Sequence, residues 1–412
     1  QMARHQVESF DDFATFQIPK TISMFNPVMI KSDRAYDGKD SMPQLEVWVT
    51  FDNFSVQRPQ IHENTGATKL MFPQVARLRN FTYAANMTVD MTLKYVIKSG
   101  PDLESEHTMY KKIPGVHIGK LPIMLKSSLC VLSQYSHVPS AVNGECEMDA
   151  GGYFIINGSE KTCQGQERAA ENMVQCFNVE KNNNKWAWMA EIKSVPDFKC
   201  ISPKQITLYQ TAKNNNGFGQ SLLLSIPRIK NPIPLFIVFR ALGVVSDKDI
   251  CQKIVLNVDD REELKENIRL LEALKASIVD AAGHLTQEEA LAFITSHAIY
   301  TPINMDKETG AAKKREFTED VLNSDLFPHC KTMTQKIYFL GYMTKKLLRC
   351  SFGWDPQDDR DSYLNKRIDL TGTLLNNLFR NYFNKLVKDM QKAVVREINN
   401  GSWRATEDFE NI

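Results

Sequence analysis

Three carboxylates stand close together in the segment 358–361 (DDRD). Carboxylate oxygens are the ligands that Mg²⁺ and Ca²⁺ prefer, so this cluster could hold a divalent cation and support a hydrolase or a nuclease. Arg360 stands between the carboxylates, however, and Lys366 and Arg367 follow soon after. Alternating charges of this kind favour ion pairing, and we interpret the segment as a charged turn that caps a helix.

The other residue types that carry out catalysis lack the spacing that their chemistry needs. None of the eight cysteines forms a Cys-x-x-Cys pair, which argues against zinc knuckles and against a dense disulfide framework. The eight histidines form no His-x-x-His pair, and Gly158 is not followed by the Gly-Lys-Ser/Thr of a phosphate loop. We therefore predict no catalytic residues and no metal site in this chain, and we interpret the glycines at 151–158 as tight turns.

The first half of the chain reads mainly as strands that follow one amphipathic helix. Apolar residues recur at helical spacing in 4–24, whereas the alternation in 44–60 and 81–97 is typical of strands. The polar stretch 99–112 indicates a loop or the tip of a hairpin, and 117–130 reads as mostly extended apolar sequence.

Helices dominate from residue 247 onward. The segment 259–282 has an apolar stripe of period 3.6, and 285–298 opens with a Thr-x-x-Glu capping box. The longest predicted helix is 369–399. Its expected apolar face consists of Leu375, Leu378, Tyr382, Leu386, Met390, Val394 and Ile398. Strand-rich and helical parts without βαβ alternation predict an α+β fold.

Positive charge is local rather than global, because the net charge is only +1. Arg77 and Arg79, in the segment ARLRN, could contact phosphate or form internal salt bridges. A basic stripe on the 369–399 helix could follow a DNA backbone or be a solvated face. That stripe consists of Lys385, Lys388, Lys392 and Arg396.

Several blocks of sequence carry a family resemblance. The blocks are FPQVARLRNFTYAANMTVDM (72–91), HIGKLPIMLKSSLC (117–130), GGYFIINGSEK (151–161) with QERAAENMVQCF (166–177), NPIPLFIVFRALGVVSDKDI (231–250), KIYFLGYMTKKLL (336–348) and QDDRDSYLNKRIDLTGTLLNNLFRNYFNKL (357–386). In order and spacing they resemble the front part of the second-largest subunit of nuclear-type multisubunit DNA-directed RNA polymerases, the eukaryotic and archaeal relatives of bacterial β. One departure is TCQG (162–165), a polar insert at a point where relatives continue an aliphatic strand.

The resemblance implies two modules. A lobe, at 186–349, is inserted into a protrusion that consists of 1–185 and 350–412. Each module should pack on its own core. The charged segment 358–361 would then fix the return of the chain from the lobe.

The resemblance also implies where nucleic acid binds. Lys161, Gln166 and Arg168 stand in a block that relatives turn toward the nucleic-acid cleft, and Lys366 and Arg367 match a basic pair beside the RNA–DNA hybrid. Such cations contact phosphate without reading bases.

Each of these assignments has a structural alternative. Lys161 and the 366–367 pair could be solvated surface residues. Arg168 could pair locally with Glu167 or Glu171.

By this resemblance the chain is part of an enzyme but lacks its catalytic centre, so no cofactor is expected here and Mg²⁺ binds elsewhere in the complete enzyme. The expected partners are the largest subunit and the other polymerase subunits, DNA, the RNA–DNA hybrid and initiation factors. An alternative is a factor-binding scaffold with little nucleic-acid contact.

The start of the chain has no apolar core of a signal peptide, and the apolar stretch 232–245 is shorter than the about 20 residues that span a bilayer. We interpret 232–245 as a buried strand that runs into a helix, and we expect no membrane contact. The expected location is intracellular: the nucleus for a cellular eukaryote, and the cytoplasm or virion for a large DNA virus.

Overall fold

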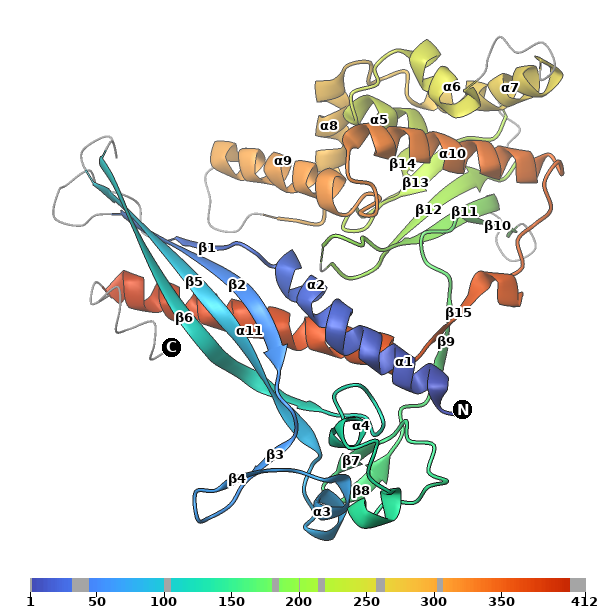
Figure 1. The fold of residues 1–412 in the computed structure, drawn as a ribbon. Coiled ribbons are helices and arrows are strands. Elements are labelled where there is room, and N and C mark those ends of the chain that lie inside the picture. Colours follow the sequence, from blue (N-terminus) through green and yellow to red (C-terminus); the bar gives the residue numbers. More distant parts are fainter. Residues whose placement is uncertain are drawn as a thin grey trace. The chain divides into compact units, whose positions relative to one another are not determined.

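In the computed structural model, the described residues are 2–31, 44–99, 105–179, 185–199, 201–213, 219–256, 264–301 and 307–400. Helices and sheets are both present, so the predicted α+β class is confirmed (Figure 1). None of the helices in these ranges combines the length and the apolar character that a membrane span requires.

The chain divides into two compact units. Unit 1 consists of residues 1–168 and 368–412, and unit 2 consists of residues 169–367. The crossings between them therefore lie in strands β9 (Gln166–Ala169) and β15 (Lys366–Asp369). The identification of the units as protrusion and lobe, with boundaries at 185/186 and 349/350, stays a prediction.

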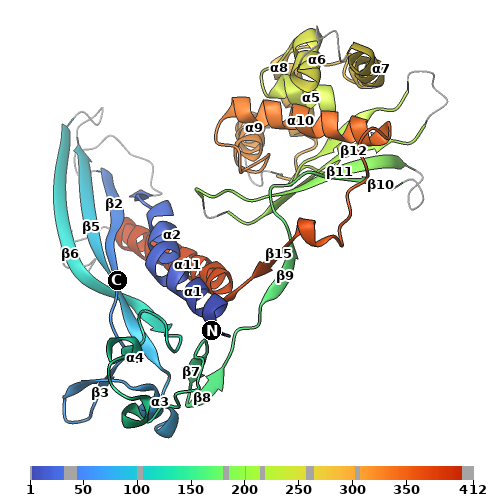
Figure 2. The same cartoon turned by 45° about the vertical axis from the view of Figure 1, so that its right-hand side comes forward.

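Unit 1 is built on an antiparallel sheet of order β1-β2-β5-β6. Its strands are β1 (Val28–Lys31), β2 (Gln44–Val56), β5 (Ala84–Ser99) and β6 (Ser105–Pro122). One face is covered by α1 (Arg4–Asp12), the π-helix η1 (Phe13–Gln17), α2 (Ile18–Met24) and α11 (Thr371–Asn400) (Figures 1 and 2). Apolar residues alternate along the strands, so every second side chain points into this helix-covered core.

Smaller elements complete unit 1. They are β3 (Gln60–His62), β4 (Thr68–Leu70), α3 (Pro73–Leu78), α4 (Val131–Gln134), the 3₁₀-helix η2 (Ser140–Asn143), β7 (Phe154–Ile156) and β8 (Ser159–Lys161). Phe383 of α11 joins the helical layer to the sheet, because its ring lies 5.2 Å from that of Phe25 and 5.3 Å from that of Phe51.

Unit 2 has a five-stranded antiparallel sheet of order β10-β11-β12-β13-β14 packed against helices. The strands are β10 (Gln175–Asn178), β11 (Trp186–Ser194), β12 (Lys204–Thr211), β13 (Leu222–Ser225) and β14 (Ile233–Pro234). The helices are α5 (Leu235–Ala241), α6 (Asp247–Val255), α7 (Leu264–Asp280), α8 (Gln287–Ser296), α9 (Lys307–Ser324), α10 (Met333–Ser351) and the 3₁₀-helix η3 (Tyr363–Asn365). The predicted strand-to-helix transition at 232–245 is confirmed as β14 and α5.

Three local predictions need correction. The polar stretch 99–112 is more than a loop or the tip of a hairpin, since β5 ends at Ser99 and β6, which pairs with it antiparallel, begins at Ser105. The extended reading of 117–130 holds only to Pro122, after which the chain turns.

The third correction concerns the apolar face of α11. Leu378, Tyr382 and Leu386 are 52%, 64% and 37% exposed rather than buried. Each step of four residues turns a helix by about 400°, so this series shifts by about 40° per step around the helix and reaches the core only toward its C-terminal end, at Val394. Phe383 and Val387, which are not in the predicted face, fill the core in their place. Val394 is buried as predicted, and Leu375, Met390 and Ile398 are partly buried against the core.

Candidate nucleic-acid interface

Lys161 is the last residue of a tight hairpin made by β7 and β8. The turn residues Asn157 and Gly158 have φ values of 50° and 77°. Two consecutive residues with positive φ are typical of the two-residue hairpin turns that favour Asn-Gly. Ile155 of β7 is buried, whereas Lys161 is exposed. The hairpin therefore presents the lysine at the surface of unit 1.

The hairpin is fixed to the segment that follows α3. Gly158 donates its amide hydrogen to the carbonyl oxygen of Phe81 at 3.0 Å, and Tyr83 donates to that of Ile155 at 2.9 Å. A Cβ atom on Gly158 would lie 2.9 Å from the Cα of Asn80. Only glycine combines this close approach with the positive φ.

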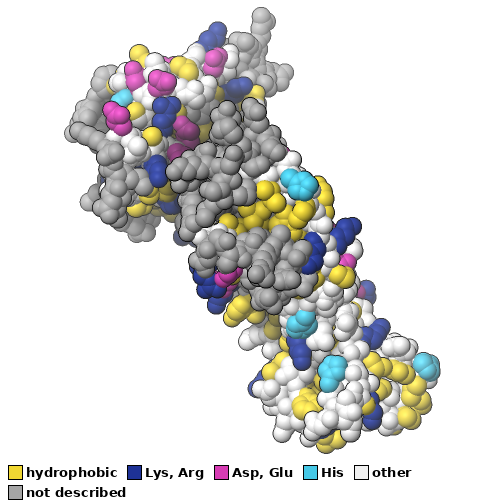
Figure 3. Space-filling model, turned by 90° about the vertical axis from the view of Figure 1, so that its left-hand side faces the viewer, with side chains coloured by type: hydrophobic (Ala, Val, Ile, Leu, Met, Phe, Trp, Pro, Cys, Tyr) yellow, Lys and Arg dark blue, Asp and Glu magenta, His cyan; other side chains and the backbone are white. Residues whose placement is uncertain are grey.

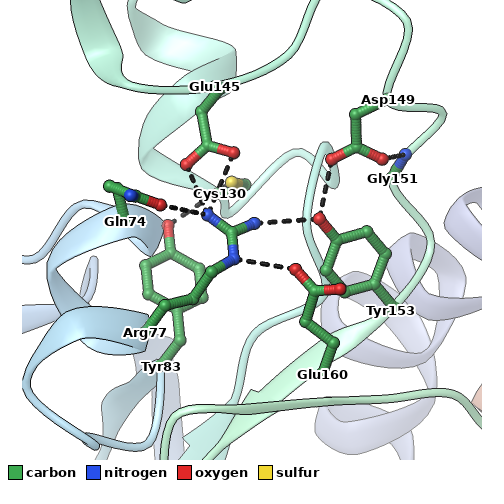
Figure 4. A network of polar contacts seen from close by, with 9 residues as sticks. All are labelled: Gln74, Arg77, Tyr83, Cys130, Glu145, Asp149, Gly151, Tyr153 and Glu160. Atoms are coloured by element: carbon green, nitrogen blue, oxygen red, sulfur yellow. Dashed lines mark hydrogen bonds and ion pairs between the residues drawn. The ribbon is translucent and has the colours of Figure 1, made fainter.

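Arg77 of α3 makes the central contacts beside the hairpin (Figure 4). Its Nε donates to Glu160 at 2.8 Å, and its terminal nitrogens donate to Glu145 at 2.9 Å and to the Tyr153 hydroxyl at 2.9 Å. Tyr153 donates in turn to Asp149 at 2.7 Å. The guanidinium thus has its hydrogen-bond partners inside the protein. Of the two interpretations of Arg77, this arrangement supports the internal salt bridge.

The electrostatics of this network stabilise its charged form. Partial burial opposes the charge of Arg77, but the Glu145 carboxylate and Tyr153 together outweigh burial and raise the pKa of the guanidinium. Burial and the neighbouring Asp149 raise the pKa of Tyr153, so its hydroxyl stays a donor. Arg79 likewise pairs internally, with Glu63 at 2.7 Å.

Lys161 differs from these arginines because its charge faces solvent. The neighbouring Glu160 carboxylate is held by Arg77. Successive side chains of a strand point to opposite faces, so Glu160 and Lys161 diverge. On the described part of the face seen in Figure 3, basic side chains stand singly or in small groups among hydrophobic and neutral ones. On this face, a phosphate contact would therefore involve individual basic side chains.

Gln166 and Arg168 follow in β9. The segment 162–165 (TCQG) connects β8 to β9 and is not part of a strand, which corrects the expectation of a polar insert within a strand. Gln166 is exposed, whereas Nε of Arg168 donates to Asp369 at 2.7 Å. The carboxylate compensates part of the arginine charge.

Lys366 and Arg367 are neighbours in β15, within unit 2. Arg367 is exposed, and its guanidinium donates to the carbonyl oxygens of Leu364 and Lys366 at 3.1 and 2.7 Å. Carbonyl oxygens leave the net charge in place, so Arg367 keeps a full positive charge at the surface.

The segment 358–361 forms ion pairs and hydrogen bonds within unit 2. Asp358 accepts from the amide of Cys176 at 2.8 Å and from Lys346 at 2.9 Å. Arg360 donates to Glu191 at 2.8 Å. Within the described ranges, no group of three His, Cys, Asp or Glu side chains is arranged to hold a metal ion.

The capping role expected of this segment is not observed. Ser362 caps η3, and the hydroxyl of Ser9 accepts from the amide of Gly372 at the start of α11. The segment instead joins the return of the chain to β10 and α10 of unit 2.

Comparison with known proteins identifies the relatives of the chain. The model of the family described as RNA polymerase beta subunit matches residues 1–410. The chain is 35% identical over 411 residues to DNA-directed RNA polymerase II subunit 2 of Arabidopsis thaliana, covering 97% of this chain and 33% of the relative. It is 35% identical over 406 residues to subunit RPB2 of Schizosaccharomyces pombe, covering 95% of this chain and 32% of the relative.

An archaeal relative is covered more completely. Over 406 residues the chain is 30% identical to DNA-directed RNA polymerase subunit Rpo2N of Methanothermobacter thermautotrophicus, covering 96% of this chain and 72% of the relative. The chain thus spans about one third of the length of the eukaryotic relatives that it matches.

Proposed function

Because the chain belongs to the RNA polymerase beta subunit family and corresponds to the N-terminal region of the second-largest subunit, we propose that it forms a wall of the nucleic-acid cleft of a DNA-directed RNA polymerase. In this proposal unit 1 is the protrusion, which borders the RNA–DNA hybrid, and unit 2 is the lobe, which lies along downstream DNA. The other polymerase subunits and initiation factors are the partners. We propose that the protein is located inside the cell or the virion, as part of the assembled polymerase.

The observation that carries the proposal is the exposed Lys161 on a rigidly held hairpin. The hairpin turn, the close approach of Gly158 and the Arg77–Glu160 ion pair fix the strand from which the lysine projects. A preorganised cation of this kind suits a phosphate, which it contacts as a point charge without reading sequence.

The other candidates contribute less directly. Gln166 is a neutral donor, and Arg168 shares its charge with Asp369. Lys366 and Arg367 add positive charge in unit 2. We propose that these four residues support backbone contacts, with Lys161 as the principal one.

The test is the stability of the elongation complex formed by the assembled enzyme. Lys161→Ala should shorten the half-life of the complex similarly on all templates. It should also reduce the steepness of log stability against log salt concentration by roughly one, the contribution of a single phosphate contact. Lys161→Arg should keep most of the effect. Lys69→Ala, at another exposed lysine of unit 1, is the matched control. An unchanged salt slope for Lys161→Ala would contradict the proposal.

The chain by itself is proposed to be inactive, with Mg²⁺ and the catalytic carboxylates contributed by the rest of the enzyme. The support is that Asp358 is held by Lys346 and the Cys176 amide. Incubation of the chain with template, nucleotides and Mg²⁺ should give no product. A product that disappears in Asp358→Asn would overturn this proposal.

A factor-binding scaffold with little nucleic-acid contact is the second candidate. The exposed apolar side chains of α11 favour a protein partner at that helix. If Lys161→Ala leaves complex stability unchanged while factor binding depends on unit 1, the scaffold explains the chain better.

A further inference from the structure

Helix α11 has two apolar stripes. Within the described residues, only one of them packs against the core of unit 1. Phe383, Val387 and Val394 are 3%, 4% and 0% exposed, and they pack in the core of unit 1. Leu378 and Tyr382 are 52% and 64% exposed on the other side of the helix.

The second stripe is continuous along the helix. Leu378, Tyr382 and Leu386 follow one another at intervals of four residues, so their side chains are neighbours on the surface. A surface helix normally has one apolar stripe and one polar face, and a helix that is apolar on two sides is normally covered on both. The second stripe therefore indicates a contact with another molecule or chain segment.

The charges along this stripe indicate what kind of partner covers it. Lys385, Lys388 and Lys392 are exposed on the solvent side of α11. Asp389 is the carboxylate nearest to them in sequence, and Glu397 pairs with Arg396 at 3.5 Å. Across 371–400 the basic residues are 380, 385, 388, 392 and 396, and the acidic residues are 389 and 397. The excess of positive charge suits an acidic partner.

We propose that the α11 docking face, defined as Leu378, Tyr382, Leu386, Lys385 and Lys392, binds an acidic amphipathic helix of a partner protein. The partner would place apolar side chains at helical spacing over the three apolar residues and carboxylates beside the lysines. This inference rests on the proposal that initiation factors are partners of the chain, and it deepens that proposal by naming the surface and the chemistry of the partner.

Nucleic acid fits the same face less well. A phosphate backbone would satisfy the lysines but would leave Leu378, Tyr382 and Leu386 in contact with water or with charged groups. Aromatic and aliphatic side chains that are desolvated together are characteristic of the centre of protein–protein interfaces.

The probe for a test is a fluorescently labelled helical peptide of about 20 residues, with leucine at every third or fourth position and glutamate on both sides of that stripe. Fluorescence anisotropy with the 412-residue chain should show saturable binding that weakens as salt increases. Tyr382→Ser combined with Leu378→Ser should weaken binding at least tenfold, and Lys385→Glu with Lys392→Glu at least fivefold.

Two matched variants test whether the effect is specific to α11. Tyr363→Ser changes a tyrosine that is 77% exposed elsewhere, and Lys275→Glu reverses an exposed lysine of α7. Both should bind the peptide like the wild type. If the double serine variant loses helical circular dichroism, the single Tyr382→Ser variant provides the measurement, because its side chain is mostly exposed.

Three outcomes would overturn the inference: no binding to the wild type, equal binding of a peptide whose leucines are replaced by serine, or displacement of the peptide by duplex DNA whose own binding is unaffected by Tyr382→Ser. Lys161 lies outside the α11 docking face, so the elongation-complex test and this test fail or succeed independently.

Discussion

The guanidinium of Arg77 contacts Glu160 at 2.8 Å, one residue before the exposed Lys161. Arg77 and Glu160 are 83 positions apart in the sequence. The contact joins α3 to β8, so the strand that carries the candidate phosphate-binding lysine is held by an ion pair on its other face.

Removal of Arg77 should therefore loosen the hairpin. Arg77→Ala leaves Glu145, which is 6% exposed, without its cation, and the free energy of unfolding of unit 1 should fall by about 2–4 kcal/mol. Hydrogen exchange at residues 154–161, followed by mass spectrometry, should increase in the native state. Arg79→Ala breaks a more exposed pair and should have a much smaller effect. Equal effects of the two substitutions would contradict the positioning role of Arg77.

Gly158 gives a test of the turn itself. Gly158→Ala adds a Cβ at φ +77° and within 2.9 Å of the Asn80 Cα, so it should cost about 2–4 kcal/mol of unfolding free energy. Gly115 has a similar φ of +66° but nothing within 4 Å of its Cβ position, so Gly115→Ala should cost only about 1 kcal/mol. Denaturant titrations of both variants measure the difference, and similar costs would show that the close approach has no energetic consequence.

The buried Lys336 should make the stability of unit 2 depend on pH. It is buried and donates to the carbonyl oxygens of Leu322 and Asn323, in the last turn of α9, at 2.8 and 2.6 Å. Burial lowers its pKa from 10.5 to about 8. Between these values the unfolded chain binds the proton and the folded protein does not, so this residue makes stability increase as pH rises from about 8 to about 10.

The measurement compares wild type with Lys336→Met by urea unfolding at several pH values. The stability of the wild type relative to the variant should improve by about 1–3 kcal/mol over this window. Other lysines, cysteines and tyrosines titrate in both proteins, so the difference isolates Lys336. A pH-independent difference would show that the folded protein keeps this lysine protonated.

The buried Arg240 should also contribute to the stability of unit 2. It is 1% exposed and donates to the carbonyl oxygens of Ala281 and His284, both at 2.6 Å, and to Asp247 at 2.6 Å. Arg240→Met keeps the apolar stem but leaves these acceptors without a donor, and should cost about 3 kcal/mol. Arg269→Met, at an exposed position of α7, serves as the control in thermal unfolding. A variant as stable as the control would show that water replaces the guanidinium.

Features encoded by nearby residues could be predicted from the sequence. The Thr286–Glu289 capping box forms as expected, because both of its hydrogen bonds join residues three positions apart. The alternation of β2 and β5 indicated their strands, and the glycines at 151–158 indicated tight turns. The family resemblance likewise depends on the order and spacing of blocks along the chain.

What the sequence could not determine is which distant group each charged or apolar side chain meets. Arg168 pairs with Asp369, 201 positions away, and Arg77 was an equally good candidate for phosphate or for a salt bridge until α3, β8 and Glu145 were placed together. The spacing of α11 likewise identified an apolar helix, but the angle at which the helix meets the sheet decides that Val387 is buried and Tyr382 is exposed. Local patterns specify elements because their hydrogen bonds are local, whereas the partner of a side chain depends on how whole elements pack, and that is fixed only by the tertiary structure.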